Sequence, residues 1–171
     1  MTAPVSGRPC VAFNLLVEKH TREGWRPILE VRDARSFVVV DESGAGLVDA
    51  NGPFVVALDV DDRGSTRWYN SAMGATQRQA LKSLLRGDNE SWSGAMTNLR
   101  YQEGVLRDGE TASIGGHGVR QVSPEAPSAN RRAPPEWLVL RGTAEEPLLI
   151  ADSVQRASVS TSVARKKATE T

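Results

Sequence analysis

Cysteine and histidine are scarce in this chain of 171 residues. The sequence contains one cysteine, Cys10, and two histidines, His20 and His117. A single cysteine cannot form an internal disulfide, so nothing indicates an oxidising compartment. Three such side chains cannot supply the ligands of a structural zinc site, and still less those of a two-zinc RING module. We therefore expect neither a disulfide framework nor a metal or other cofactor.

Long apolar runs and an excess of one charge are also missing. No apolar stretch approaches the roughly 18 residues that span a bilayer, and residues 1–8 contain no apolar segment typical of a signal peptide. The 21 basic and 21 acidic residues balance, so no overall field attracts nucleic acid or an anionic membrane. We predict a soluble, cytoplasmic protein.

Alternation of apolar and polar residues dominates the first sixty positions. It predicts half-buried strands over residues 11–17, 25–31 and 54–60. The β-branched run at residues 37–40 is instead typical of a strand that is covered on both faces. The Asp and Gly residues of segment 41–46 predict a turn into a returning strand at residues 47–48. Short connections favour antiparallel hairpins throughout.

A single helix is predicted at about residues 76–86, after a polar loop at residues 61–74. Thr76 and Gln79 have the spacing of a capping box, leucines 81, 84 and 85 form an apolar stripe, and Gly87 follows the stripe. A strand is expected over residues 99–105, followed by a hairpin turn at Asp108 and Gly109.

The remaining chain predicts further strands and two polar segments. The glycines at 115, 116 and 118 indicate a bent strand, and residues 137–140 and 148–150 indicate a last hairpin. Residues 122–135 are rich in Pro, Ser and Ala and predict a mobile loop, whereas residues 154–171 predict a polar, disordered tail. The expected fold is mainly β, a small antiparallel OB-like barrel or curved sheet with one short helix, in one domain over residues 1–153.

Catalytic constellations are not evident, so we predict that the chain is not an enzyme. His20 and His117 lie in turn-like segments, and no G-x-S-x-G nucleophile elbow occurs. Gly115, Gly116 and Gly118 precede a strand-like segment rather than the helix that a phosphate loop requires. Asp59, Asp61 and Asp62 lack the ligand spacing of an EF-hand, and Cys10 reads as a small buried hydrophobe.

Two weaker patterns bear on binding. Aromatic and basic residues that an oligonucleotide groove would need are scattered, and they comprise Trp68, Tyr69, Arg78, Trp92, Arg100 and Tyr101. The short basic run Arg165, Lys166 and Lys167 predicts at most a weak contact with an anionic membrane surface.

Five sequence blocks together resemble the GIDE domain, also called the BAM (beside-a-membrane) domain, of the mitochondrial-type membrane E3 ubiquitin ligases. The blocks are residues 6–11, residues 37–41 with Gly44 and Val48, residues 99–106, the segment 109–115 and residues 147–153. They span nearly the whole chain in order. The positions that carry the resemblance are Gly7, Pro9, Cys10, Asp41, Gly44, Tyr101, Glu103, Gly109 and Gly115.

The resemblance implies a non-catalytic domain that binds a partner protein, in a stand-alone relative that we expect to be bacterial. Family members carry this domain between transmembrane helices and end in a RING, neither of which is visible here, so ubiquitin transfer is not expected. Glu103 faces the same way as Tyr101 in an alternating strand and is either buried and paired or exposed at a binding face. An OB-type module for single-stranded nucleic acid is the alternative. Either way, a partner macromolecule is expected.

Overall fold

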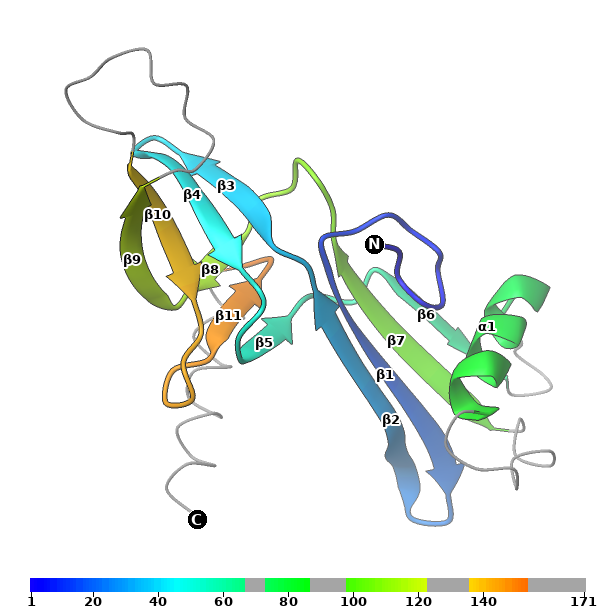
Figure 1. Ribbon diagram of the computed structural model, residues 1–171. Coiled ribbons are helices and arrows are strands. Elements are labelled where there is room, and N and C mark those ends of the chain that lie inside the picture. Colours follow the sequence, from blue (N-terminus) through cyan, green and yellow to red (C-terminus); the bar gives the residue numbers. More distant parts are fainter. Residues whose placement is uncertain (67–72, 87–97, 123–135, 154–171) are drawn as a thin grey trace. The chain divides into compact units, whose positions relative to one another are not determined.

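The computed structural model describes residues 1–66, 73–86, 98–122 and 136–153 (Figure 1). Its tertiary contacts divide the chain into two compact units, a subdivision that the prediction of one domain over residues 1–153 did not contain. Unit 1 comprises Met1–Asp33 and Leu58–Glu110, and unit 2 comprises Ala34–Ala57 and Thr111–Thr171. The predicted loop beyond residue 122 and the predicted tail, with its basic run, lie outside the described residues.

Unit 1 is built on one four-stranded sheet. The strands are β1 (Ala12–Thr21), β2 (Gly24–Ala34), β6 (Asp62–Ser65) and β7 (Leu99–Leu106), in the order β2-β1-β7-β6. β1 and β7 pair antiparallel with Leu15 opposite Glu103. The alternation predicted from the sequence places Phe13, Leu15 and Val17 on the buried face. β6 lies inside the segment that was predicted as a polar loop, because its side chains carry little β propensity.

One helix, α1 (Ala75–Arg86), covers part of this buried face, as predicted (Figure 1). Leu81 is fully buried and packs in the same cluster as Phe13, Val17 and Tyr101. The capping prediction was displaced by two residues. The Gly74 N–H donates to Gln77 Oε1 at 2.9 Å, and the helix begins at Ala75 directly after this cap.

Unit 2 contains two small sheets. The first has the order β3-β4-β10-β9 and the second has the order β5-β11-β8. The strand bounds are β3 (Phe37–Asp41), β4 (Gly44–Asp49), β5 (Phe54–Ala57), β8 (Ser113–Gly115), β9 (His117–Val122), β10 (Glu136–Arg141) and β11 (Leu148–Ala151).

Pairing in unit 2 confirms a mainly β fold and corrects its details. β4 pairs with β10 in parallel, and β5 pairs with β11 in parallel, so the described sheets are mixed and do not close into the predicted barrel. Strands β10 and β11 belong to different sheets rather than to one last hairpin. The turn at Asp108 and Gly109 exists, with Gly109 at φ 80°. It joins β7 to β8 in another sheet, and so it is not a hairpin turn.

Candidate functional site

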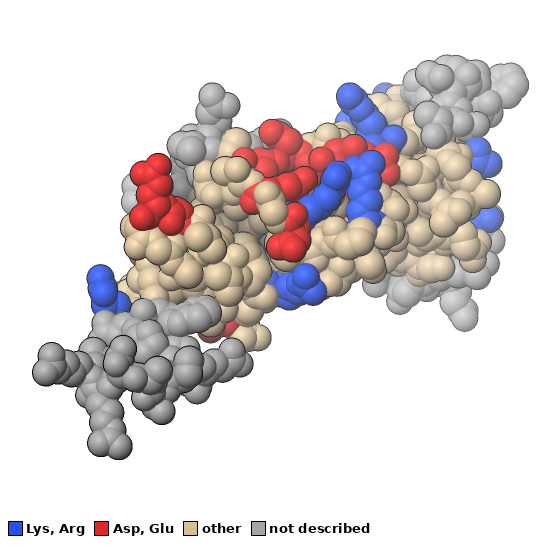
Figure 2. Space-filling view, turned by 90° about the horizontal axis from the view of Figure 1, so that it is seen from above, with Lys and Arg blue, Asp and Glu red and all other residues tan. Residues whose placement is uncertain are grey.

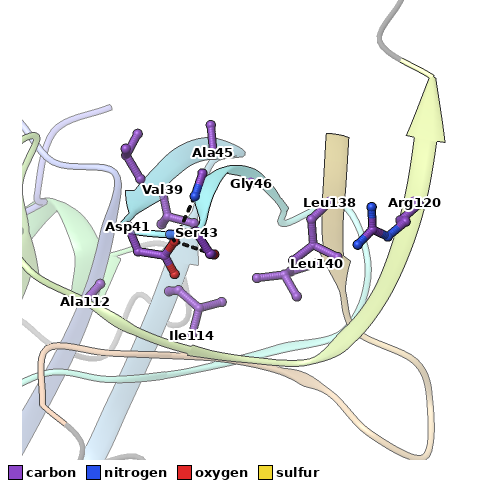
Figure 3. A pocket seen from close by; sticks show the side chains of 12 residues that line it. Val39, Asp41, Ser43, Ala45, Gly46, Ala112, Ile114, Arg120, Leu138 and Leu140 are labelled. Atoms are coloured by element: carbon purple, nitrogen blue, oxygen red, sulfur yellow. Dashed lines mark hydrogen bonds between the residues drawn. The ribbon is translucent and has the colours of Figure 1, made fainter. Parts of the chain in front are cut away.

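A groove with a volume of about 510 Å³ lies on unit 2 (Figure 3). Strands β3, β4, β9 and β10 and the segment before and within β8 form it. Ile114, Leu138 and Leu140 surround the hollow, with Asp41 on one side and Arg120 on the other (Figure 3). The groove therefore has an apolar floor between an anionic and a cationic side chain.

The register of the first sheet of unit 2 explains the hollow. Val39 pairs with Gly46, Gly46 with Leu138, and Leu138 with Arg120. These four residues form one row across the sheet and all line the groove. Gly46 supplies no side chain, and a Cβ there would lie 3.3 Å from the Leu138 carbonyl oxygen. The surface of the sheet is therefore hollowed at Gly46, because this residue has no side chain between those of Val39 and Leu138.

Strand β3 forms one edge of the groove and of the sheet. Among the described residues its ladder partner is β4 alone. The side chain of Val40 is 77% exposed and that of Val38 is 49% exposed. The prediction that residues 37–40 would be covered on both faces was wrong, because a β-branched run shows strand propensity and not the position of the strand in its sheet. Leu138, in the adjoining floor, is also 44% exposed.

Asp41 shapes the turn that ends β3. Its Oδ1 accepts hydrogen bonds from the Ser43 N–H at 2.7 Å, the Ser43 hydroxyl at 2.6 Å and the Gly44 N–H at 3.1 Å. The hydrogen bonds from Ser43 hold the pKa of Asp41 below its ordinary value of 3.8. Gly44 adopts φ 138°, which an L side chain rarely adopts. The predicted turn at residues 41–46 is thus confirmed, with Asp41 as its cap.

The other predicted motif positions of unit 1 serve the attachment of the N-terminal loop, residues 1–10. Gly7 turns the loop with φ 69°, and Pro9 bridges Thr2. Cys10 is buried, as predicted, and its N–H donates to the Met1 carbonyl at 3.0 Å. Gly115, in unit 2, ends β8 against Leu149, where a Cβ would lie 3.6 Å from the Leu149 Cβ.

Glu103 is buried and paired rather than exposed at a binding face. It has no exposed surface, and its two carboxylate oxygens accept hydrogen bonds from the N–H groups of Val5 and Ser6, at 2.8 Å each. Backbone donors that hold both oxygens of a buried carboxylate compensate its desolvation. Glu103 therefore fastens the N-terminal loop to β7, and this resolves the alternative that the sequence left open.

Tyr101 is also internal. It is 1% exposed, and its hydroxyl has no partner of ordinary hydrogen-bond geometry among the described residues. Burial and, to a lesser degree, the charge of Asp62 raise its pKa. Gly64 leaves room for the ring, because a Cβ there would overlap it. Tyr101 thus fills the core of unit 1 and is not available to stack on a base.

The residues considered for catalysis or metal binding are dispersed or already engaged. The ring of His20 packs edge-on against Trp25 at 5.1 Å, and His117 begins β9 in unit 2. Asp61 accepts a hydrogen bond from the Val105 N–H at 2.8 Å, and Asp62 accepts one from the Gln77 side chain at 3.1 Å. Within the described ranges no group of three or more His, Cys, Asp or Glu side chains could hold a metal ion.

The residues proposed for an oligonucleotide groove do not form one where the structure describes them. Trp68, Tyr69 and Trp92 lie outside the described residues. Arg100 stacks over the ring of Trp25 at 4.5 Å and forms two hydrogen bonds with Glu18, and this pairing raises the pKa of Arg100. The basic side chains on the face shown in Figure 2 occur in separate small groups and not as one continuous patch.

Sequence reasoning missed most of the groove. Asp41, Gly44 and the valines of β3 were named in the sequence, but Ala112, Ile114, Arg120, Leu138 and Leu140 were not assigned to a site. The parallel pairing of β4 with β10 brings together segments about ninety positions apart. No local spacing records such a pairing, so no sequence signal could have assembled this groove.

Comparisons with family models, curated proteins and solved structures found no match to this chain. The resemblance to the GIDE domain therefore stays a prediction. In the part of the chain that the structure describes, no helix is long and apolar enough to cross a membrane.

Proposed function

We propose that this chain is a non-catalytic protein-interaction module that binds an extended partner segment along the outer edge of β3, which no described strand occupies. The observation that carries the proposal is the exposure of Val40 and Val38, at 77% and 49%, on an edge strand. An added strand gains main-chain hydrogen bonds from such an edge, and its alternate side chains contact the neighbouring pockets. The proposed setting is the cytoplasm.

The chemistry of β3 differs from that of the edge strands β2 and β9, and its exposure differs from that of the edge strand β5 (Phe54–Ala57), which is also uncharged but has no exposed residue. Proteins usually protect a free edge with charged residues or proline. β2 carries Pro27, Arg26 and Arg32, and β9 carries Arg120. Between Phe37 and Val40, β3 carries no charge and no proline. An unprotected edge of exposed valines is an aggregation hazard unless another strand covers it, and this favours a binding role.

The groove supplies the specificity that an edge alone lacks. A strand that pairs with β3 places every second side chain on the same face as Val39, next to the floor formed by Leu138 and Leu140. Arg120 and Asp41 lie on opposite sides of that floor. We expect bound segments to be extended, with alternate apolar side chains, and to contain neither proline nor like charges at the pairing positions.

Selection from a display library of short random peptides, with the full chain immobilised, tests the proposal. We expect enriched peptides to bind the wild-type chain and the Val60→Lys variant equally, and to bind Val40→Lys at least about tenfold more weakly, because a lysine on an edge strand disfavours the addition of another strand. Val60 is the matched control, since it is an exposed valine (43%) of unit 1. Failure to enrich any peptide, or equal binding by Val40→Lys, would contradict the proposal.

The nucleic-acid alternative has its own measurement. A fluorescence titration with single-stranded DNA at low salt is expected to show no saturable binding, because Tyr101 is buried and Arg100 is paired with Glu18. Saturable binding that weakens steeply with salt would favour the alternative instead.

A further inference from the structure

We infer that one occupant of the β3 edge is a second copy of this chain, paired antiparallel through β3 about a two-fold axis at Val39. The inference rests on the proposed function, because it names a partner for the same edge. It also predicts a closed dimer rather than a fibre, since an isologous pairing uses the same edge of both copies and leaves neither free.

The hydrogen-bond pattern of β3 is self-complementary in one register. β3 and β4 are joined by a two-residue turn with Asp41 opposite Gly44, and the pair that closes such a hairpin is hydrogen-bonded. Hydrogen-bonded and non-hydrogen-bonded pairs alternate from there. Val40 and Val38 therefore direct their N–H and C=O groups away from β4. When Val38 lies opposite the second copy's Val40, and Val40 opposite its Val38, the outward N–H and C=O groups of all four valines can form hydrogen bonds between the two copies.

The side chains agree with the same register. The exposed valines of the two copies form one apolar cluster on the face opposite to Val39, and apolar β-branched pairs across strands are stabilising. Phe37 lies opposite the second copy's Asp41. The exposed Arg35 precedes β3 by two residues, and we expect its long side chain to approach that carboxylate. Diagonal neighbours are within reach of long side chains. We therefore expect opposite charges to meet at both ends of the pairing, and the register sets no like charges of β3 face to face.

Disulfide cross-linking of variants that each carry one new cysteine in β3 tests the proposed register directly. On the two-fold axis, Val39 faces its own counterpart in a non-hydrogen-bonded pair with Cα atoms about 4.5 Å apart, within the range that a disulfide spans. We expect Val39→Cys to form a disulfide-linked dimer on mild oxidation. Val38→Cys and Val40→Cys should each do so at least about tenfold less, but should cross-link with each other when mixed, because these positions face one another.

The wild-type chain under the same oxidation controls for the buried Cys10. Equal cross-linking of Val38→Cys and Val39→Cys, or no cross-link at Val39→Cys, would overturn the inference.

Sedimentation of the unmodified full chain supplies a measurement that needs no new cysteine. We expect the average mass to rise toward that of a dimer with concentration, and no further. Val40→Lys should weaken this association at least about tenfold, Arg35→Asp should weaken it to a smaller, salt-dependent degree, and the exposed-site controls Val60→Lys and Arg22→Asp should leave it unchanged.

The two proposals fail separately. A chain that stays monomeric but still selects peptides in a Val40-dependent manner overturns self-pairing and leaves the proposed function standing. A chain that does neither overturns both. Growth beyond a dimer contradicts the two-fold register.

Discussion

Replacing Glu103 with alanine will release the N-terminal loop from the sheet of unit 1. The Glu103 carboxylate is completely buried and holds the N–H groups of Val5 and Ser6. Each hydrogen bond to a charged acceptor contributes about 1.5–3 kcal/mol. The Val5 N–H is buried and would stay unpaired, whereas the Ser6 N–H is only partly buried and can turn to water. Loss of the desolvation cost of the carboxylate offsets part of the penalty.

These contributions give a net cost of about 2–4 kcal/mol for Glu103→Ala. Such a cost corresponds to roughly 30- to 1,000-fold faster opening of the loop, at about 1.4 kcal/mol per tenfold. Glu103→Gln keeps the shape and one acceptor oxygen but turns an amide N–H₂ toward the other backbone donor. It should therefore fall between the wild-type chain and Glu103→Ala, at about tenfold.

Amide hydrogen exchange of Val5 and Ser6, followed by NMR in the full chain, measures this opening locally. A local measurement is preferable because two compact units need not unfold in one transition. Glu145→Ala is the matched control, since Glu145 is exposed in unit 2. If the Val5 and Ser6 amides of Glu103→Ala exchange at wild-type rates, the carboxylate does not anchor the loop.

Three further predictions concern pH and close packing. The pKa of Asp41 is lowered below 3.8 by Ser43, so the turn is stabilised above that pH and released as pH falls through the lower folded value. The Ser43 amide shift follows this release, and a midpoint at or above 3.8 contradicts it. Burial raises the pKa of Tyr101 above 10.0, so the stability that depends on its neutral form is fully present below pH 10 and is lost as pH rises through the higher pKa of the folded state. Phenolate absorbance from Tyr101 should then accompany unfolding and not precede it. Gly142→Ala should destabilise unit 2 by about 3 kcal/mol or more in urea, because the new Cβ would overlap the Pro53 carbonyl; unchanged stability would contradict this packing.

Local patterns predicted those elements whose burial follows from their own periodicity. The alternation of β1 and the leucine stripe of α1 are visible in the sequence because each buries one regular face. Strand β6, Asp62–Ser65, has no such face. Its strand conformation depends on antiparallel pairing with β7, and partners supplied by distant segments leave no local periodicity. For the same reason, the parallel pairing of β4 with β10 and of β5 with β11 could not be predicted from the sequence.

The sequence predicted the turn of the candidate site but not the exposure of the valines in β3. Asp41 and Gly44 were readable because an Asp cap and a glycine at positive φ are requirements of the turn itself. Val40 looks like a core residue in the sequence, since the same side chain suits a central and an edge strand. Glu103 posed the opposite problem, because a carboxylate in an alternating strand is buried only when distant backbone donors, here those of Val5 and Ser6, reach it.

The proposed self-pairing and the proposed partner binding are coupled, because both would use the edge of β3. β3 can pair with one additional strand, so a copy that is engaged in the dimer cannot accept a partner segment. The two equilibria therefore compete, and the apparent affinity for a partner must fall as the concentration of the chain rises. The proposed dimer would also pair the outward backbone groups of Val38 and Val40 when no partner is present, which would remove the aggregation hazard of an unpaired apolar edge. An exchange of the second copy's β3 for a partner strand would then explain how the chain can keep an unprotected valine edge and remain available for binding.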